Sequence, residues 1–336
     1  MNGWLRLIFV SLISIITPSY NQVAYLEYTL QSVLAQDYPH IEYLVIDGGS
    51  IDGSLDIIRR YADRLAWWVS EPDAGQADAI NKGFSRARGE YIAWLNSDDL
   101  YLPGAVMQAV AVLQANPELG MVFGDAFTIN SDGMPLNALV FGDWGLPDLM
   151  AFRIICQPAV FMRRSILERA GYLDSSYHYM LDHQLWLRLA RLAPIRHVSQ
   201  TWAAARHHAA AKNVAHAEAF GEEALHILEW MEVQPDLASL VAANRHKIIA
   251  GAYRLNGRYL LDGGLSASAL KSYLRALIND PVYTLKHGRR MAYAAASLVG
   301  LGGLADRLVS RQAKHPVVLS VGAGENWPGL RSRDID

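Results

Sequence analysis

Cysteine is nearly absent from the sequence: Cys156 is the single one among 336 residues. One cysteine cannot form a disulfide bond within the chain, and it cannot supply the several thiolates of a cysteine-rich zinc module. This scarcity fits a reducing compartment, and we expect the protein in the cytoplasm.

Charged residues are also few, at 19% of the chain, and the formal net charge is -3. Without an excess of cations there is no basic field to attract a nucleic-acid backbone, which argues against a general nucleic-acid binder. Hydrophobic residues make up 51% of the chain. That share and the length predict one large α/β domain of roughly 200–250 residues plus an appendage.

Long apolar runs are missing. The stretches Trp4–Ile16 and Met291–Leu304 are both shorter than the roughly 20 residues that a membrane-spanning helix needs. No small-residue cleavage pattern follows the first stretch. We interpret its second half, Leu12–Ile16, as a buried strand rather than as part of a signal peptide, and we expect no spanning segment.

Two cofactor fingerprints are lacking as well. Gly48, Gly49 and Gly53 do not form the G-x-G-x-x-G pattern of dinucleotide-binding proteins, and no G-x-x-x-x-G-K-[ST] phosphate loop occurs. Both cofactor classes are therefore disfavoured.

What is present, from residue 12 to about 125, is an alternation of strand-like and helix-like patterns. It predicts an α/β fold with a mostly parallel sheet and helices on both faces. We expect Asn21 to cap the first helix and Pro103 to lie in the first turn of a later one. The predicted strands are residues 12–16, 41–46, 67–70, 91–95 and 121–124.

Beyond residue 125 the alternation ends. Ser131-Asp132-Gly133 predicts a hairpin turn, residues 157–162 a strand and residues 182–192 an amphipathic helix. After about residue 205 the pattern is helical, with a helix–turn–helix pair within 246–280. The sequence thus predicts an α/β domain of residues 1–210 and a helical subdomain of residues 211–336.

Acidic residues follow three of the predicted strands, at Asp47, at Asp73 and at Asp98-Asp99. The carboxyl ends of parallel strands form one edge of a sheet, where ligands bind. Two adjacent carboxylates suit a hard divalent cation such as Mg²⁺ or Mn²⁺. The alternative is that each acid caps a helix or lies in a solvated turn.

Asp182 and a later polar cluster are further candidates. Asp182 opens a predicted helix, so a helix-capping role and a general-base role in an apolar setting both remain open. The cluster His207, His208 and Lys212 reads either as a set of metal or phosphate ligands or as a solvated helix end.

Taken in order, five segments resemble family 2 glycosyltransferases with the GT-A fold, over about residues 10–215. The variety SEPD-x-G followed by DA-x-NKG is similar to the branch found in bacterial exopolysaccharide and lipopolysaccharide assembly. The matching segments are SIITPSYNQ (14–22), LVIDGGSIDGS (44–54), SEPDAGQADAINKG (70–83), GEYIAWLNSDD (89–99) and YMLDHQLWLRLA (179–190).

The resemblance implies a role for each matched position. Asp98 and Asp99 would hold a divalent cation, Mn or Mg, on the donor diphosphate, and Asp182 would deprotonate the acceptor. Tyr20 would stack on the base, and Asp47 would read it, usually uracil. The full set of implied donor-binding residues is Thr17, Pro18, Tyr20, Asp47, Asp73, Lys82, Asp98 and His208.

The sequence departs from the family pattern at several positions. Asn96 stands where many members have the first acid of the metal motif, which weakens the expectation of tight metal dependence. Gly48 replaces a second aspartate and leaves the base preference open. Leu181 replaces the acid before the predicted base, and Ala211 and Asn213 replace hydroxyl residues.

The implied function is that of an inverting glycosyltransferase of hexosyltransferase type. It would move a sugar from a nucleoside diphosphate, usually UDP, to a glycan or lipid-linked glycan in cell-surface polysaccharide biosynthesis. We expect no nucleic-acid partner. Lys286–Arg290 and the apolar stretch after it are typical either of a surface helix in peripheral contact with the inner face of the plasma membrane or of packing within the helical subdomain. The alternatives are a non-catalytic sugar-nucleotide-binding scaffold and a nucleotidyltransferase. The lack of a glycine-rich phosphate loop disfavours the latter.

Overall fold

The computed structural model describes residues 11–208 and 217–299. The chain divides into two compact units. Among the described residues, 11–145 and 155–207 form the first unit, and 146–154, 208 and 217–299 form the second.

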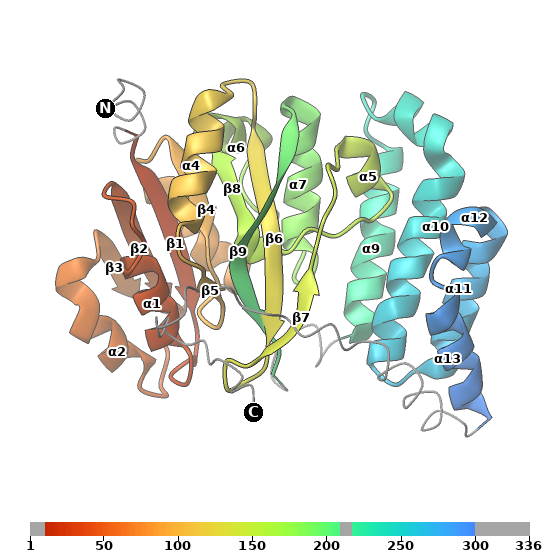
Figure 1. Cartoon of the computed structure of the whole chain (residues 1–336), viewed down its shortest axis with the longest axis horizontal. Helices are drawn as coiled ribbons and strands as arrows, with labels where there is room; N and C mark the ends of the chain where they lie inside the picture. Colours follow the sequence, from red (N-terminus) through yellow and green to blue (C-terminus); the bar gives the residue numbers. More distant parts are fainter. Residues whose placement is uncertain (1–10, 209–216, 300–336) are drawn as a thin grey trace. The chain divides into compact units, whose positions relative to one another are not determined.

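The first unit contains a sheet with nine strands among the described residues (Figure 1). Their order across the sheet is β3-β2-β1-β4-β8-β6-β9-β5, and β7 pairs with β6. The strands are β1 (Ile13–Ser19), β2 (Ile41–Asp47), β3 (Trp67–Ser70), β4 (Tyr91–Trp94), β5 (Leu100–Tyr101), β6 (Met121–Ile129), β7 (Pro135–Leu139), β8 (Val160–Arg163) and β9 (Ile195–Arg206).

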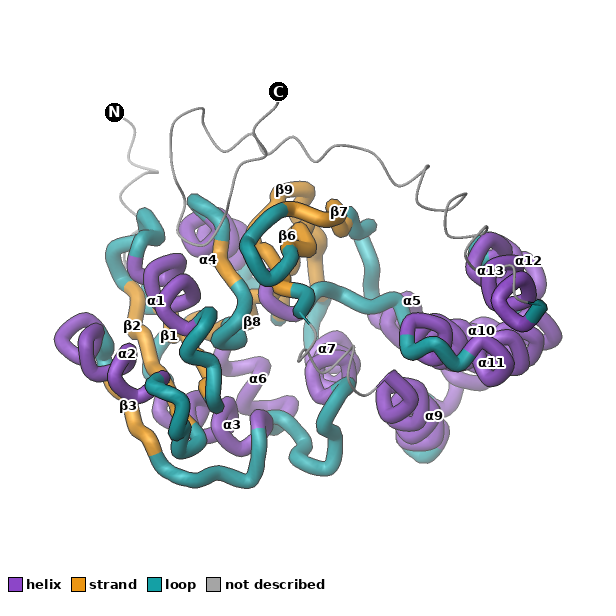
Figure 2. Tube along the Cα trace, turned by 90° about the horizontal axis from the view of Figure 1, so that it is seen from below, coloured by secondary structure: helices purple, strands orange, loops and turns teal. Residues whose placement is uncertain are grey.

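Helices cover both faces of this sheet, which confirms the predicted α/β fold. Ile13 and Ile15 of β1 join a core with residues of α1 and α4 on one face. Gly83 of α3 lies against Ile16 on the other face, where α6 and α7 also lie (Figure 2). The helices are α1 (Leu26–Leu34), α2 (Ser54–Tyr61), α3 (Gln76–Arg86), α4 (Ala105–Ala115), α6 (Arg164–Ala170) and α7 (Leu181–Leu192), with short 3₁₀ turns at Ala62–Arg64 and Gln157–Ala159.

The sheet is parallel at one side and mixed at the other. β1 runs parallel to β2 and β4, and β2 runs parallel to β3. β8 is antiparallel to both β4 and β6. β7 is antiparallel to β6, and β9 is antiparallel to β5. The prediction of a mostly parallel sheet therefore holds for the strands joined by helical crossovers. Among the later strands the sheet is mixed: β6 runs parallel to β9, β6 and β7 form an antiparallel hairpin, and the other antiparallel pairs join segments far apart in the chain.

Two local predictions were wrong. Asn21 does not cap α1, which begins five residues later at Leu26. Its backbone has a φ of 51°, its N–H donates to Ser50 Oγ (2.8 Å), and its side-chain oxygen accepts the Ile51 N–H (3.0 Å). Asn21 thus joins two loops. Pro103 lies outside α4, because Gly104 with a φ of 75° is the N-cap.

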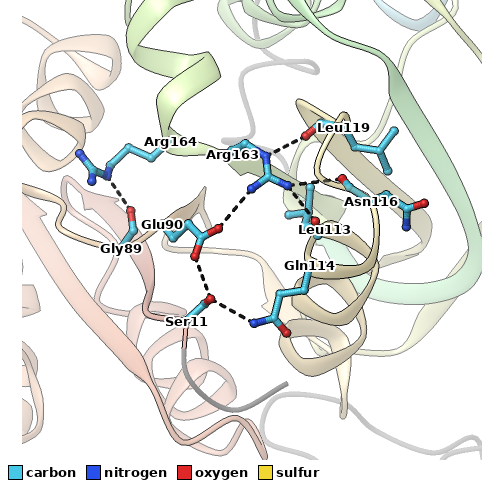
Figure 3. A network of polar contacts seen from close by, with 9 residues as sticks. All are labelled: Ser11, Gly89, Glu90, Leu113, Gln114, Asn116, Leu119, Arg163 and Arg164. Atoms are coloured by element: carbon cyan, nitrogen blue, oxygen red, sulfur yellow. Dashed lines mark hydrogen bonds and ion pairs between the residues drawn. The ribbon is translucent and has the colours of Figure 1, made fainter. Parts of the chain in front are cut away.

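Arg163, at the end of β8, ties together the edge of the sheet where β1 and β4 begin (Figure 3). It pairs with Glu90 (3.2 Å), and Glu90 in turn accepts the Ser11 hydroxyl (2.8 Å). This network lies at the opposite strand ends from the acidic residues, so we assign it to stability. The guanidinium also donates to the carbonyl oxygens of Leu113, Asn116 and Leu119.

The second unit is helical, and the predicted helix–turn–helix pair is confirmed as α10 and α11. Part of the apolar stretch 291–304 lies in α13, where Met291 and Tyr293 pack against a core that includes Tyr273; the rest falls outside the described residues. Of the helices described, none is both apolar and long enough to cross a bilayer. The helices are α5 (Leu146–Met150), α9 (Ala217–Glu232), α10 (Ala238–Asp262), α11 (Ser266–Asn279), α12 (Pro281–Leu285) and α13 (Gly288–Leu298).

Residues 146–154 belong to this helical unit although they precede it by some 60 residues in the chain. Gly251 of α10 lets the backbone of Ala151 approach so closely that no side chain fits between them. Arg254 donates to the Phe152 carbonyl oxygen (2.8 Å), and the Tyr283 hydroxyl donates to that of Ala151 (3.3 Å). Three contacts therefore hold this segment on α10 and α12.

Candidate functional site

The carboxyl ends of the parallel strands lie at one edge of the sheet. Ser19 at the end of β1 is the register partner of Asp47 at the end of β2, and Asp47 is the partner of Ser70 at the end of β3. β4 runs parallel to β1 and ends at Trp94, two residues before the loop 96–99. The acidic residues that follow β2, β3 and β4 therefore come from neighbouring strand ends.

Asp47 is fully buried, and its carboxylate is engaged within its own loop. One oxygen accepts the N–H groups of Gly49 (3.2 Å) and Ser50 (2.9 Å) and the hydroxyl of Ser70 (2.7 Å), and the other accepts the Ser50 hydroxyl (2.5 Å). Three donors share one oxygen and one donor binds the other, which keeps room for a further donor. Asp47 thus shapes the glycine turn and has one oxygen with a remaining acceptor site.

Gly48 lets Asp73 lie against this turn. A Cβ at Gly48 would lie 2.6 Å from the Asp73 carboxylate, so a side chain there would displace it. The other oxygen of Asp73 accepts the Gly75 N–H (2.8 Å) just before α3. The structure thus places two of the predicted donor-binding residues, Asp47 and Asp73, on one glycine turn.

Lys82, on α3, forms an ion pair with Glu71 (2.6 Å). Glu71 raises the pKa of Lys82 through a hydrogen bond between their side chains. The backbone N–H of Glu71 donates to the Asp47 carbonyl oxygen (3.0 Å). Lys82 is therefore a fixed positive charge beside the ends of β2 and β3.

The three predicted residues on or after β1 differ in exposure. Thr17 and Pro18 are buried, and the Thr17 hydroxyl is hydrogen-bonded to that of Tyr43 (2.9 Å) inside the sheet. Tyr20, directly after β1, is 61% exposed. Of the three, Tyr20 has the ring face that is open for stacking.

The adjacent acids Asp98 and Asp99 have different surroundings. Asp99 is buried, and its oxygens accept the Arg206 N–H (2.9 Å) and the Asn96 side-chain amide (3.3 Å). Burial and the charge of Asp98 raise the pKa of Asp99 well above its usual value. Asp98 is half-buried. Of the two predicted cation ligands, Asp98 is thus the more accessible, while Asp99 fastens the loop to β9.

A chain of side-chain amides supports this loop, and the sequence gives no sign of it. Gln76 donates to the Asn96 side-chain oxygen (2.8 Å), and Asn96 donates to Gln157 (3.1 Å). Gln157 donates in turn to the Trp94 carbonyl oxygen (2.8 Å). Amide side chains carry no charge or periodicity that would mark them, so a spacing argument could not find this network.

Asp182 is the second residue of α7 and is half-buried. Its carboxylate accepts the N–H of His183 (2.7 Å). One turn further on, buried Trp186 stacks on Trp94, with ring centroids 5.1 Å apart. Asp182 therefore lies both at a helix start, as the helix-capping role requires, and near a large aromatic pair, as the general-base role requires.

The start of α7 lies against the end of β4. Trp186, one turn after Asp182, stacks on Trp94, and Trp94 is followed by the loop that carries Asp98 and Asp99. The charges of Asp99 and Asp182 both add to the raised pKa of the Cys156 thiol. The structure thus brings the predicted base and the predicted metal motif into one neighbourhood.

Arg206, the last residue of β9, is buried and packed over the Tyr25 ring at 4.7 Å. Its guanidinium donates to the Asp98 carbonyl oxygen (2.9 Å) and to two carbonyl oxygens of the β6–β7 turn. His207 and half-buried His208 follow it, and the His207 N–H donates to a β6 carbonyl oxygen. Lys212, like Ala211 and Asn213, lies outside the described residues.

Within the described ranges, no group of three or more His, Cys, Asp or Glu side chains is arranged to hold a metal ion by itself. Mg²⁺ commonly takes one or two carboxylates and completes its shell with water and substrate phosphates. Accessible Asp98 beside Asp99 offers the hard oxygen ligands for such a site. The chain thus fits a cation that binds together with a phosphorylated ligand.

Comparison with known proteins gives one family. The family model described as glycosyl transferase family 2 matches residues 14–143. An uncharacterized glycosyltransferase of Mycobacterium tuberculosis is 31% identical over 186 residues, covering 53% of this chain and 68% of the relative. The putative teichuronic acid biosynthesis glycosyltransferase TuaG of Bacillus subtilis is 35% identical over 132 residues, covering 38% of this chain and 52% of TuaG. A relative from Rickettsia conorii is 29% identical over 56% of this chain, which spans only 33% of the rickettsial protein's length.

Solved structures with the same fold carry nucleotide sugars. Staphylococcus aureus TarS 1-349 in complex with UDP-GlcNAc has 18% sequence identity and a TM-score of 0.61, over 89% of this chain and 92% of that one. A mannosyltransferase from Pyrobaculum calidifontis in complex with GDP-Man and Mn²⁺ has 18% identity and a TM-score of 0.55, over 90% and 88%. At these identities the likeness shows the fold alone, which is the predicted GT-A type.

Proposed function

The chain belongs to glycosyltransferase family 2, and on this premise we propose that it transfers a sugar from a nucleoside diphosphate to an acceptor hydroxyl with inversion. The observation that carries the proposal is the Trp94–Trp186 stack, which holds the start of α7, with Asp182, against the end of β4, which the pair Asp98-Asp99 follows. In this proposal Asp182 is the base and Asp98-Asp99 the diphosphate site.

The donor in this proposal binds along the ends of β1, β2 and β3. Tyr20 stacks on the base, Asp47 and Asp73 hold the glycine turn beside it, and Lys82 offers its charge to the diphosphate. The resemblance favours uracil as the base. The structural neighbours were solved with UDP-GlcNAc and with GDP-Man, so the fold itself accommodates both nucleotides. His208 remains a further donor-binding proposal.

The chemistry is a single displacement. Asp182 accepts the proton of the acceptor hydroxyl while the hydroxyl oxygen attacks the anomeric carbon from the side opposite the diphosphate, so the configuration inverts. A divalent cation, when held by Asp98 and Asp99, offsets the charge of the leaving diphosphate. The Trp94–Trp186 stack fixes α7 against β4 and thereby positions the carboxylate.

The acceptor in this proposal is a glycan or lipid-linked glycan of cell-surface polysaccharide synthesis, reached from the inner face of the plasma membrane. The name of TuaG, a putative teichuronic acid biosynthesis enzyme, supports this class. The alternative is a protein that binds sugar nucleotides without turnover.

The test is release of nucleoside diphosphate from a panel of UDP-, GDP- and dTDP-sugars with Mg²⁺ or Mn²⁺. We expect one donor to be consumed, and Asp182→Asn to lower the rate by about 10²–10⁴-fold while donor binding remains. Asp63→Asn, at an exposed aspartate of a 3₁₀ turn, is the matched control and should keep full activity. Turnover that survives in Asp182→Asn would contradict the assigned base. Donor binding without turnover in the parent protein, tested with glycan acceptors present, would favour the alternative.

A further inference from the structure

Exposed aliphatic side chains gather on two consecutive helices of the helical unit. The exposed fractions are 47% for Leu274 and 82% for Ile278 on α11, and 76% for Val282 and 62% for Leu285 on α12. The solvent-facing stripe of a helix in a globular protein is normally polar. Grouped exposed apolar residues on such a stripe mark an interaction surface.

The same stripe carries positive charge. On α11, exposed Lys271 and Arg275 alternate with Leu274 and Ile278 at the i, i+3, i+4, i+7 spacing of one helix face. Exposed Lys286 and Arg289 follow α12. We call these eight residues the basic–apolar face: Lys271, Leu274, Arg275, Ile278, Val282, Leu285, Lys286 and Arg289.

Acidic residues are nearly absent from this part of the chain. Residues 263–299 contain five Lys or Arg residues and one acid, Asp280. Asp280 caps α12 by accepting the Tyr283 N–H (2.9 Å). The segment therefore carries an excess of cationic over acidic residues.

The opposite sides of these helices are packed inside the unit. Tyr273 and Ala276 of α11 and Thr284 of α12 are fully buried. α13, which holds part of the stretch that the sequence suggested for membrane contact, places Ala294 in the same core. The exposed aliphatic residues of α11 and α12 thus extend the surface that the sequence suggested around Lys286–Arg290.

We propose that the basic–apolar face docks the protein on a bilayer that contains anionic lipids. Aliphatic side chains flanked by Lys and Arg match the interface of such a bilayer, where the apolar groups enter the acyl boundary and the cations meet the headgroups. A second copy of the face would oppose cations with cations. A polyanionic glycan would match the charge and leave the aliphatic residues in water. The inference rests on the proposed function for its purpose, which is to bring the enzyme to a lipid-linked acceptor.

The test is co-sedimentation of the full chain with vesicles of phosphatidylcholine alone and of phosphatidylcholine with phosphatidylglycerol, at low and high salt. We expect binding only to the anionic vesicles, weakened by salt. Lys271→Glu with Arg275→Glu should lower the partition coefficient by about tenfold or more. Ile278→Asp should lower it similarly, while Val233→Asp, at a residue of the same unit that is 72% exposed, should leave it unchanged.

Donor turnover by the same variants separates this proposal from the proposed function. The face contains none of the site residues, so Ile278→Asp should keep the parental rate of diphosphate release and the parental circular dichroism spectrum. Absence of binding by the parent protein to anionic vesicles, or equal binding by Ile278→Asp, would overturn the docking proposal. So would a dimer in solution that Ile278→Asp dissociates. Vesicle binding by a protein that turns over no donor would instead count against the enzyme assignment alone.

Discussion

Replacing Asn96 by aspartate is the sharpest perturbation of the proposed cation site. The change restores the acid found at this position in many family members and alters few atoms. In the native structure the Asn96 amide donates to the Asp99 carboxylate (3.3 Å) and to Gln157 (3.1 Å). An aspartate keeps the oxygen that accepts from Gln76 but cannot donate to either partner.

The cost can be worked out from these distances. Losing a hydrogen bond to a charged group costs about 1.5–3 kcal/mol. Two full charges at that separation would repel by about 5 kcal/mol at an effective dielectric constant of about 20. Proton uptake relieves much of this repulsion, because burial and Asp98 already raise the pKa of Asp99. We therefore expect Asn96→Asp to lose about 2–4 kcal/mol of unfolding free energy without a cation.

A divalent cation should offset much of this loss. Three carboxylates in place of two raise the affinity for Mg²⁺, and a ligand at about 100 times its dissociation constant adds about 2.7 kcal/mol. Urea unfolding at neutral pH in the presence of a nucleoside diphosphate, with and without Mg²⁺, measures both effects. Tryptophan fluorescence is a suitable probe, since Trp94 and Trp186 stack in the same region.

Asn96→Ala is the matched control, because it removes the amide without adding a charge. We expect Mg²⁺ to stabilise Asn96→Asp more than Asn96→Ala by at least about 1.4 kcal/mol, a tenfold difference in affinity. An equal response of the two variants to Mg²⁺ would refute the placement of the cation at this loop.

Three further changes test the structure elsewhere. Gly83→Ala would place its Cβ 2.6 Å from Ile16 Cγ2, so we expect overpacking to cost about 1–3 kcal/mol in urea unfolding, and an unchanged midpoint would contradict the packing. Burial and Arg254 lower the pKa of His287 from 6.5 to about 4. The unfolded chain thus binds a proton that the folded one does not, so stability should fall as the pH drops from 6.5 towards 4. After allowance for its partial exposure the loss is about 1–2 kcal/mol, and a His287→Gln variant with the same slope would disprove this origin. Arg206→Lys cannot serve the three carbonyl oxygens that the guanidinium binds, so it should lose about 2–3 kcal/mol of unfolding free energy, measured by fluorescence, and parental stability would refute the role.

The strands near the N-terminus were predictable because they are short, apolar and bounded by turns. The run 41–46 became β2 and the run 67–70 became β3. Their buried, β-branched sequences leave few alternatives. The position of the acids followed from the same reasoning, since parallel strands bring their carboxyl ends to one edge.

β9 was not predicted, because most of its first seven residues are polar and partly exposed and show no strand pattern. The place of β8 between β4 and β6 rests on pairing between distant segments, which local sequence does not encode. The state of Asp47 was equally hidden. Only the folded turn shows that one oxygen of its carboxylate already accepts three hydrogen bonds. A motif thus indicated which residue lies at the site but not whether its oxygens are available.

The segment 146–154 determines where the protein can be truncated or its units exchanged. The chain leaves the sheet-bearing unit, lays Leu149 and Phe152 among buried residues of the helical unit, and returns at residue 155. A cut near residue 210 would therefore remove the helices but leave behind the strip that α10 holds through Gly251 and Arg254. The helical region is not an interchangeable tail. Exchange of this part between relatives would need to move two separate stretches of sequence together.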